Sequence, residues 1–199
     1  MLDANDQLDV VRGLREGSRD AWARLYDGYS LEVWRYVSRL LGPNAAAVAD
    51  VVQESFLAAA GSAKRFDPAR GTLWSWLTGI AHHRVTAYWR QETRGAAVRK
   101  ILESQTAEIS QWLESTEPFD ALCEQRELAE LVRCVLAELS ADYAALLTAK
   151  YLDEQSLADL APQCGLSLEA LKSKLARARR EFRAKFANFA TKAAPTTRN

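Results

Sequence analysis

The sequence predicts an all-α protein with two helical domains. Apolar residues recur at spacings of three and four through most of the chain, the period of a helix with one buried face. Alternating runs of the kind that form strands are nearly absent. With 199 residues, of which 48% are hydrophobic, the chain can bury one or two cores. We expect a helical bundle at 1–91, a flexible acidic linker at 92–120, a helix-turn-helix domain at 121–189 and a disordered tail at 190–199.

The net charge is zero, but the charge is unevenly distributed along the chain. Residues 1–90 contain 11 basic and 10 acidic residues, a net charge of +1. Residues 91–136 contain 5 and 9, a net charge of −4, and residues 137–199 contain 10 and 7, a net charge of +3. The neutral total therefore conceals a basic C-terminal segment of the kind that binds nucleic acid.

The C-terminal segment from Ser156 to Phe186 predicts a helix-turn-helix. Ser156 can cap a short first helix, Gly165 can take the left-handed conformation of a tight turn, and Ser167 can cap a long second helix. Pro162 lies late in the first helix, where its missing N–H should tighten or shorten the last turn.

The second of these helices has two unlike faces. Its predicted buried face consists of Leu168, Leu171, Leu175, Ala178, Phe182 and Phe186. Its opposite face carries Glu169, Lys172, Ser173, Ala176, Arg177, Arg180 and Arg183. Seven Lys or Arg residues and two Glu give 168–185 a net charge of +5, which suits a recognition helix in the major groove of DNA. An ordinary solvated face is the alternative.

The N-terminal segment begins with two predicted helices. A short one covers 8–16, and Ser18 or Asp20 can cap a longer one. This longer helix should end at Gly42 and Pro43, because proline cannot continue the hydrogen-bond ladder. Its predicted apolar face consists of Trp22, Leu25, Tyr26, Tyr29, Val33, Tyr36, Val37 and Leu40.

The next predicted helix, 44–60, has a polar face with an apolar centre. Its buried side is expected to consist of Val48, Val51, Val52, Phe56 and Ala59. On the other side, Leu57 lies among Asp50, Gln53 and Glu54 at helical spacing. An apolar centre within a polar rim is typical of protein interfaces, and a solvated face with one isolated leucine is the alternative.

A basic loop, 61–71, precedes a helix at 73–91 that Thr72 can cap. The predicted inner side of this helix is formed by Leu73, Trp76, Leu77, Ile80, Arg84 and Tyr88. The outer side is expected to carry Thr78, His82, Thr86, Trp89 and Arg90. Exposed aromatic and basic residues beside a basic loop suit single-stranded nucleic acid, on whose bases aromatic rings stack. The alternative is that the rings close a core, which we prefer for Trp76.

No catalytic, cofactor or metal site stands out in the sequence. His82 and His83 point about 100° apart on a helix, and neither has a Cys or carboxylate four residues later. Phosphate-binding loops, nucleophile triads and paired catalytic carboxylates are not recognisable. We therefore predict neither an enzyme nor a cofactor-dependent protein.

The cysteines and the N-terminus favour a cytoplasmic location. Cys123, Cys134 and Cys164 lack metal-ligand spacing, and we expect reduced, buried thiols. The N-terminus has no signal-peptide pattern, and no apolar run approaches the ~20 residues of a membrane span.

Three segments together resemble the extracytoplasmic-function sigma factors of bacteria. DVVQESFLAAA at 50–60 is similar to the segment of that family that binds core RNA polymerase. FDPARGTLWSWLTGIAHHR at 66–84 is similar to its minus-10 reading and melting segment, and 136–182 to its minus-35 reading domain. The three occur in the family's order, with an unpatterned segment between the second and the third.

The resemblance implies roles for particular residues. The D-x-x-Q-E pattern implies that polymerase is bound by Asp50, Gln53, Glu54 and Leu57. The loop and the following helix imply minus-10 contacts and melting by Lys64, Arg65, Phe66, Asp67, Arg70, His82, His83, Trp89 and Arg90. The recognition helix implies minus-35 contacts by Glu169, Lys172, Ser173, Lys174, Ala176, Arg177 and Arg180. The acidic linker is similar to the segment that threads the RNA path of the polymerase.

The sequence departs from the family pattern at several of these positions. His83 stands where the family often has Asn, which affects minus-10 specificity. Ala47, Ala49 and Ala87 replace commonly acidic residues, which should weaken polymerase affinity or change the partner.

The resemblance implies a non-enzymatic subunit that binds core RNA polymerase and promoter DNA and helps to open the promoter. It also implies an anti-sigma factor as a partner, a monomer when free and no membrane insertion. Two alternatives remain from the sequence: a decoy that binds an anti-sigma factor without DNA, and a helix-turn-helix repressor that acts without polymerase.

Overall fold

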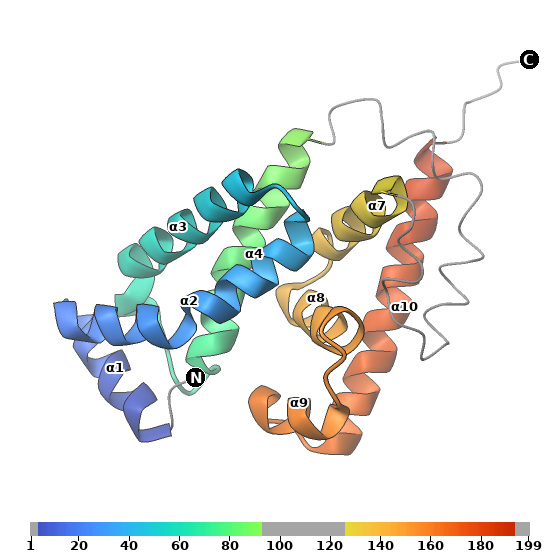
Figure 1. The fold of residues 1–199 in the computed structure, drawn as a ribbon. Helices are drawn as coiled ribbons and strands as arrows, with labels where there is room; N and C mark the ends of the chain where they lie inside the picture. The colour runs from blue at the N-terminus through green and yellow to red at the C-terminus, as the bar shows by residue number, and fades with distance from the viewer. Residues whose placement is uncertain (1–3, 93–125, 194–199) are drawn as a thin grey trace, which may run out of the picture. The chain divides into compact units, whose positions relative to one another are not determined.

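The computed structural model describes residues 4–92 and 126–193 (Figure 1). These residues form helices and connecting turns without a strand, so the all-α class is confirmed. The helices of the N-terminal part are α1 (Ala4–Glu16), α2 (Arg19–Leu41), α3 (Ala45–Ser62), the 3₁₀ turn η1 (Ala63–Arg65) and α4 (Leu73–Glu92). Those of the C-terminal part are α7 (Arg126–Ala137), α8 (Ala141–Leu147), the π-helical turn η3 (Thr148–Leu152), α9 (Leu157–Cys164) and α10 (Leu168–Ala193).

The chain forms two compact units, as expected, and the division falls between Val85 and Thr86 inside α4. In the first unit α2 packs against both α1 and α3. The hydroxyl of Ser18 caps α2 by accepting from the backbone N–H of Ala21 at 3.3 Å. Gly17 precedes this cap with a φ of 75°, a conformation that glycine adopts without strain.

The core of the first unit is built mainly by α2, with α3 and α4 covering it. Its largest fully buried side chains include Tyr29, Leu25, Leu40, Leu73 and Leu77. Tyr29 stacks on Trp74 with ring centroids 6.5 Å apart. The predicted face of α2 is therefore confirmed in its centre.

The inner side of α4 differs from the predicted one. The residues that it buries are Leu73, Leu77, Thr78, Ala81, His82 and Val85, whereas Trp76, Ile80 and Arg84 are only partly covered. Two polar residues thus lie inside, and both have hydrogen bonds. The Thr78 hydroxyl donates to the carbonyl of Trp74 at 2.7 Å, and His82 Nδ1 lies 2.9 Å from the hydroxyl of Tyr36. Polar groups can be buried when they have hydrogen-bond partners. The inner side of α4, predicted mainly from its apolar residues, was therefore partly wrong.

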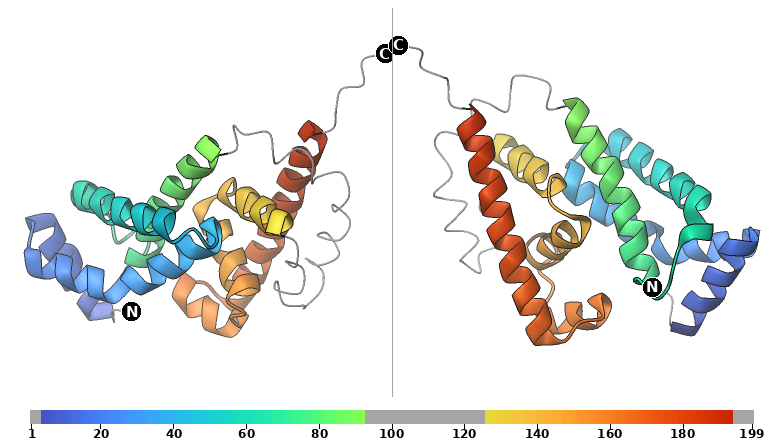
Figure 2. Two further views of the ribbon diagram at one scale, coloured as in Figure 1. Left: turned by 45° about the horizontal axis from the view of Figure 1, so that its top comes forward. Right: turned by 180° about the vertical axis from the view of Figure 1, so that it is seen from behind.

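In the second unit α10 lies along α7, α8 and α9 (Figure 2). Ser140 caps α8 by accepting from the N–H of Tyr143 at 3.4 Å. After Leu147 this helix changes to the wider π-helical turn η3. α10 extends to Ala193 and so passes the predicted end at residue 189. Apart from Glu92, the last residue of α4, the predicted linker lies outside the described residues.

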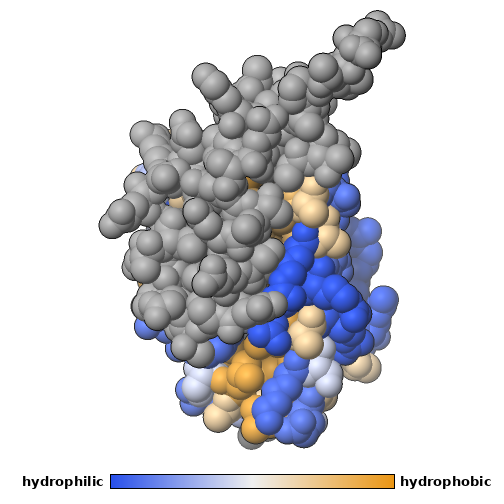
Figure 3. All heavy atoms as spheres, turned by 90° about the vertical axis from the view of Figure 1, so that its right-hand side faces the viewer, coloured by the Kyte–Doolittle hydropathy of each residue, from blue (hydrophilic) through white to orange (hydrophobic). Residues whose placement is uncertain are grey.

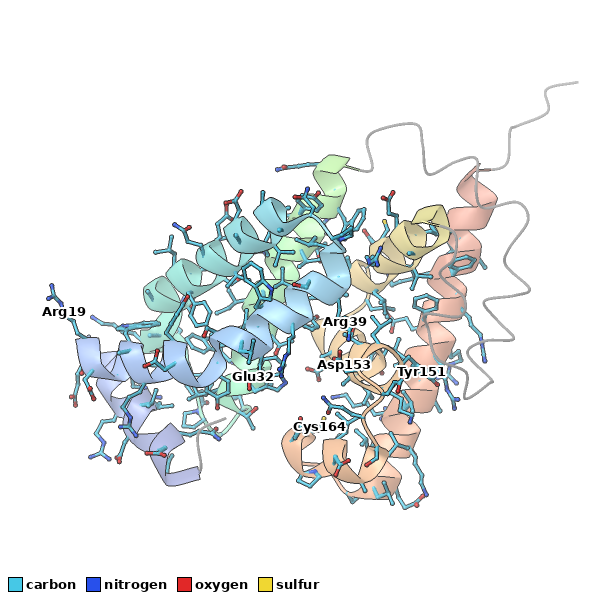
Figure 4. The ribbon with its side chains drawn as sticks, in the orientation of Figure 1. Arg19, Glu32, Arg39, Tyr151, Asp153 and Cys164 are labelled. Carbon is cyan, nitrogen blue, oxygen red and sulfur yellow. The ribbon has the colours of Figure 1, made fainter. Side chains whose placement is uncertain are left out.

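The two cysteines in the described part have different environments. Cys134 is buried, and this burial, with a smaller effect of Glu138, raises the pKa of its thiol to about 12. Cys164 is exposed at the end of α9 (Figure 4), so the expectation of a buried thiol is wrong there. Across residues 4–92 and 126–193, no helix has the combined length and apolar character that a membrane span requires.

Candidate nucleic-acid and partner-binding surfaces

The outer face of α3 carries the four residues predicted to bind a partner. Asp50, Gln53, Glu54 and Leu57 are all exposed, and 64% of the leucine is accessible. α3 contains two carboxylates and no Lys or Arg, so its own charge is negative. Glu54 is partly compensated, because its Oε2 lies 3.6 Å from Nη1 of Arg84 on α4. The face therefore combines an exposed apolar side chain with uncompensated negative charge at Asp50.

Tyr26 of α2 adjoins this face, although its place in the sequence pattern predicted burial. Its ring centroid lies 4.9 Å from that of Phe56, and 52% of Tyr26 is exposed. Phe56 directly precedes Leu57, so the tyrosine extends the apolar area of α3 onto α2. The exposure of Tyr26 could not be predicted from the sequence, because helical spacing alone does not distinguish a residue at the edge of an apolar stripe from one at its centre.

The basic loop that consists of η1 and the residues up to α4 is anchored by Phe66. Only 6% of this side chain is exposed, its ring lies 5.1 Å from that of Trp76, and its carbonyl accepts from Arg15 Nη2 at 2.7 Å. Phe66 is therefore buried in this structure, and its role at the minus-10 element stays a prediction. The other predicted residues of the loop, namely Lys64, Arg65, Asp67 and Arg70, are exposed.

The turn within this loop is held by Asp67. Its Oδ1 accepts from the N–H of Ala69 at 3.0 Å, and its carbonyl accepts from the N–H of Arg70 at 3.0 Å. This short turn and the buried Phe66 limit the conformational freedom of the loop. The backbone positions of Lys64, Arg65 and Arg70 are therefore well defined.

The predicted promoter-facing residues of α4 separate into two groups. His83 and Arg90 are exposed, and Trp89 is half-buried with its ring 5.8 Å from that of Tyr88. His82 is only 6% exposed and bonds to Tyr36, so the expectation of an exposed His82 is wrong. His82 lies on the inner side of α4, and its hydrogen bond to Tyr36 joins α4 to α2.

The helix-turn-helix forms as the sequence predicts. Ser156 accepts from the N–H of Asp159 at 3.1 Å, and Ser167 accepts from the N–H of Ala170 at 3.2 Å. Gly165 has a left-handed φ of 62°. Its N–H donates to the carbonyl of Pro162 at 3.1 Å, three residues back, so the last turn of α9 is tightened and the helix still reaches Cys164.

The exposed face of α10 carries most of the predicted minus-35 residues. The exposed ones are Glu169, Lys172, Ser173, Ala176, Arg177 and Arg180. The part of the surface that Figure 3 colours by hydropathy shows hydrophilic residues with hydrophobic ones between them. Five of the six residues on the predicted inner face are buried, and Leu168 is the exception at 42% exposure.

Two of the lysines on α10 already have carboxylate partners. Lys172 Nζ lies 2.8 Å from Glu169 Oε1 one turn earlier, and Lys174 Nζ lies 2.7 Å from Asp142 Oδ2 on α8. The second pair joins two helices, and the lysine side chain is only 24% exposed. The charge of Lys174 is thus partly used within the unit, which leaves Arg177 and Arg180 as the more available cations.

Comparisons with known proteins identify the family of the chain. Residues 25–95 match the family model of sigma-70 region 2, and residues 129–182 match that of sigma-70 region 4. The ECF RNA polymerase sigma factor SigL of Mycobacterium tuberculosis is 32% identical over 169 residues, covering 80% of this chain and 85% of that protein. The chain belongs to the ECF sigma factors.

Other ECF sigma factors are also similar. SigC of M. tuberculosis is 31% identical over 154 residues, with 74% of each chain covered, and BldN of Streptomyces coelicolor is 29% identical over 175 residues, with 86% and 62% covered. A solved structure of CnrH in complex with the cytosolic domain of CnrY aligns with a TM-score of 0.47 and 20% identity over 90% of this chain and 96% of that one.

Membership of this family confirms a role in transcription initiation as a non-enzymatic subunit. Most of the region 2 match, residues 25–85, lies in the first unit, and the whole region 4 match lies in the second.

Proposed function

We propose that this ECF sigma factor binds core RNA polymerase through the outer face of α3, recognises minus-10 and minus-35 promoter elements, and promotes promoter opening. The observation that carries the proposal is the outward row of Asp50, Gln53, Glu54 and Leu57. A stable fold gains little from exposing Leu57 there, whereas a protein interface gains from an apolar centre with a polar rim.

The chemistry of the α3 face indicates which polymerase surface it fits. Asp50 and Glu54 attract basic side chains, and the absence of Lys and Arg from α3 leaves no like charge to repel them. Leu57, extended by Tyr26, supplies the area for an apolar contact. We therefore expect a polymerase element with basic residues around an apolar side chain.

The basic loop that includes η1, together with the outer side of α4, is assigned to the minus-10 element. Lys64, Arg65 and Arg70 are placed to contact phosphates, and the turn at Asp67 to shape a pocket for a flipped base. Flipping costs a few kcal/mol, which stacking and pocket contacts offset. Phe66 and His82 support this surface from inside, and we assign His83, Trp89 and Arg90 to the strands that separate.

The exposed face of α10 is assigned to the minus-35 element, with its first turns in the major groove and Arg177 and Arg180 on phosphates. An anti-sigma partner and a monomeric free state remain predictions of the family resemblance, as does the role of the linker in the RNA path. A cytoplasmic location remains a prediction from the cysteines and the N-terminal sequence.

A gel shift on promoter DNA with and without core polymerase tests the proposal. We expect a complex that requires both the protein and the polymerase. A decoy for an anti-sigma factor would give no polymerase-dependent complex, and a repressor would shift the duplex tightly by itself. The net charge of +5 at 168–185 argues against the decoy hypothesis, because a decoy binds no DNA. The repressor hypothesis does not explain the exposed row of residues on α3.

A further inference from the structure

Leu168 is the exposed large apolar side chain of the second unit. Among its residues 129–188, whose side chains the structure describes, the other large apolar side chains are buried or partly covered, whereas 42% of Leu168 is accessible. Its neighbour one turn later, Leu171, is completely buried. The apolar stripe of α10 thus continues one residue beyond the core that it covers.

The position of Leu168 is well defined. It is the first residue of α10, and the Ser167 cap fixes the turn around it through the 3.2 Å bond from Ala170. The residues next to it on the exposed side are charged or polar, beginning with Glu169 and Lys172, which pair at 2.8 Å. Arg177, nine residues after Leu168, projects from another side of the helix.

An isolated exposed leucine needs no special explanation on a protein surface. This one, however, opens a cationic helix whose N-terminal residues are those that reach base edges in a helix-turn-helix. In the major groove, the apolar group that distinguishes one base from the others is the C5 methyl of thymine. A polyanionic duplex is also the partner that the surrounding cations favour.

We propose that Leu168 packs on the methyl group of a thymine in the upstream promoter element and makes the protein prefer thymine at that position. The inference rests on the proposed binding of that element by α10 and adds a residue that the sequence pattern assigned to the core. The contact is apolar, so it contributes to sequence preference and leaves the salt dependence of binding to the arginines.

The test measures binding of the reconstituted holoenzyme to promoters in which each upstream thymine is replaced in turn by deoxyuridine, which lacks only the methyl group. The wild type should lose about fourfold in affinity at one position, the factor expected for burying one methyl group. Leu168→Ala should bind the thymine and deoxyuridine promoters equally. Leu168→Met, which keeps an apolar side chain, should retain a preference for thymine.

Arg180→Ala is the matched control on the same helix. It should weaken binding to both promoters while the difference between thymine and deoxyuridine persists. Equal binding of the two by the wild type, or an unchanged difference in Leu168→Ala, would overturn the role of Leu168 while promoter binding stands. Failure to form a polymerase-dependent complex on any promoter would instead overturn the proposed function, and this inference with it.

Discussion

Two tyrosines in the core of the first unit should respond oppositely to loss of their hydroxyl groups. Tyr36 bonds through its hydroxyl to His82 Nδ1 at 2.9 Å in a buried setting. The hydroxyl of Tyr29 is buried without a hydrogen-bond partner among the described residues. Tyr36→Phe removes a satisfied bond and should lower the free energy of unfolding by about 1–3 kcal/mol. Tyr29→Phe removes a desolvated group that gains nothing, and should leave stability unchanged or raise it by about 1 kcal/mol.

Urea unfolding of the full chain followed by tryptophan fluorescence measures this difference. Among the described residues, the first unit contains Trp22, Trp34, Trp74 and Trp76, and the second unit contains Trp89. Trp74 contacts both tyrosine rings, at 6.5 Å in each case, so its signal follows this core. Equal destabilisation by the two variants, or a stable Tyr36→Phe, would refute the role of the buried hydrogen bond.

Three further predictions concern pH, DNA and thiols. Burial, then Glu32, raises the pKa of Tyr29 from 10.0 to about 12, so the folded state holds the phenolic proton more tightly than the unfolded state, and stability should fall as pH rises from 10.0 towards 12. Tyr29→Phe should flatten this loss in unfolding experiments across that range, and an unchanged pH profile would contradict the assignment. Arg177→Ala should reduce the slope of log affinity for promoter DNA against log salt concentration by about 1, whereas Lys174→Ala should reduce it less because Asp142 already pairs with the lysine. Equal slopes for the two variants in a salt titration would argue against that pairing. In a variant that lacks Cys123, iodoacetamide should label the exposed Cys164 and leave the buried Cys134 unlabelled, which mass spectrometry measures. Rapid labelling of Cys134 would disprove its burial.

The features that the sequence predicted well depend on residues close together in the chain. Ser18, Ser156 and Ser167 each cap a helix, and Gly165 takes the left-handed turn. A cap joins residues two or three positions apart, so its chemistry is visible without knowledge of the fold. The exposed α3 row was also predictable, because 3.6-residue periodicity separates the two faces of a helix.

The features that were missed depend on contacts between distant residues. His82 is buried because Tyr36, 46 residues away, bonds to its ring, and Lys174 is partly neutralised by Asp142, 32 residues away. Tyr26 and Leu168 are exposed because the cores that their stripes face end before them. Helical spacing gives the side of a helix on which a residue lies, but the extent of the neighbouring element decides whether that residue is covered.

The most direct test of the central claim is the affinity of the labelled protein for core RNA polymerase, measured by fluorescence anisotropy. Replacing both Asp50 and Glu54 with Ala should weaken binding by more than about tenfold, since contacts to charged groups contribute about 1.5–3 kcal/mol each. The fold should persist because both residues are exposed. The control, Glu16→Ala with Glu138→Ala, removes the same charge from exposed positions elsewhere and should bind as the wild type does. Unchanged affinity of the Asp50 and Glu54 variant would contradict the assignment of α3 to the polymerase.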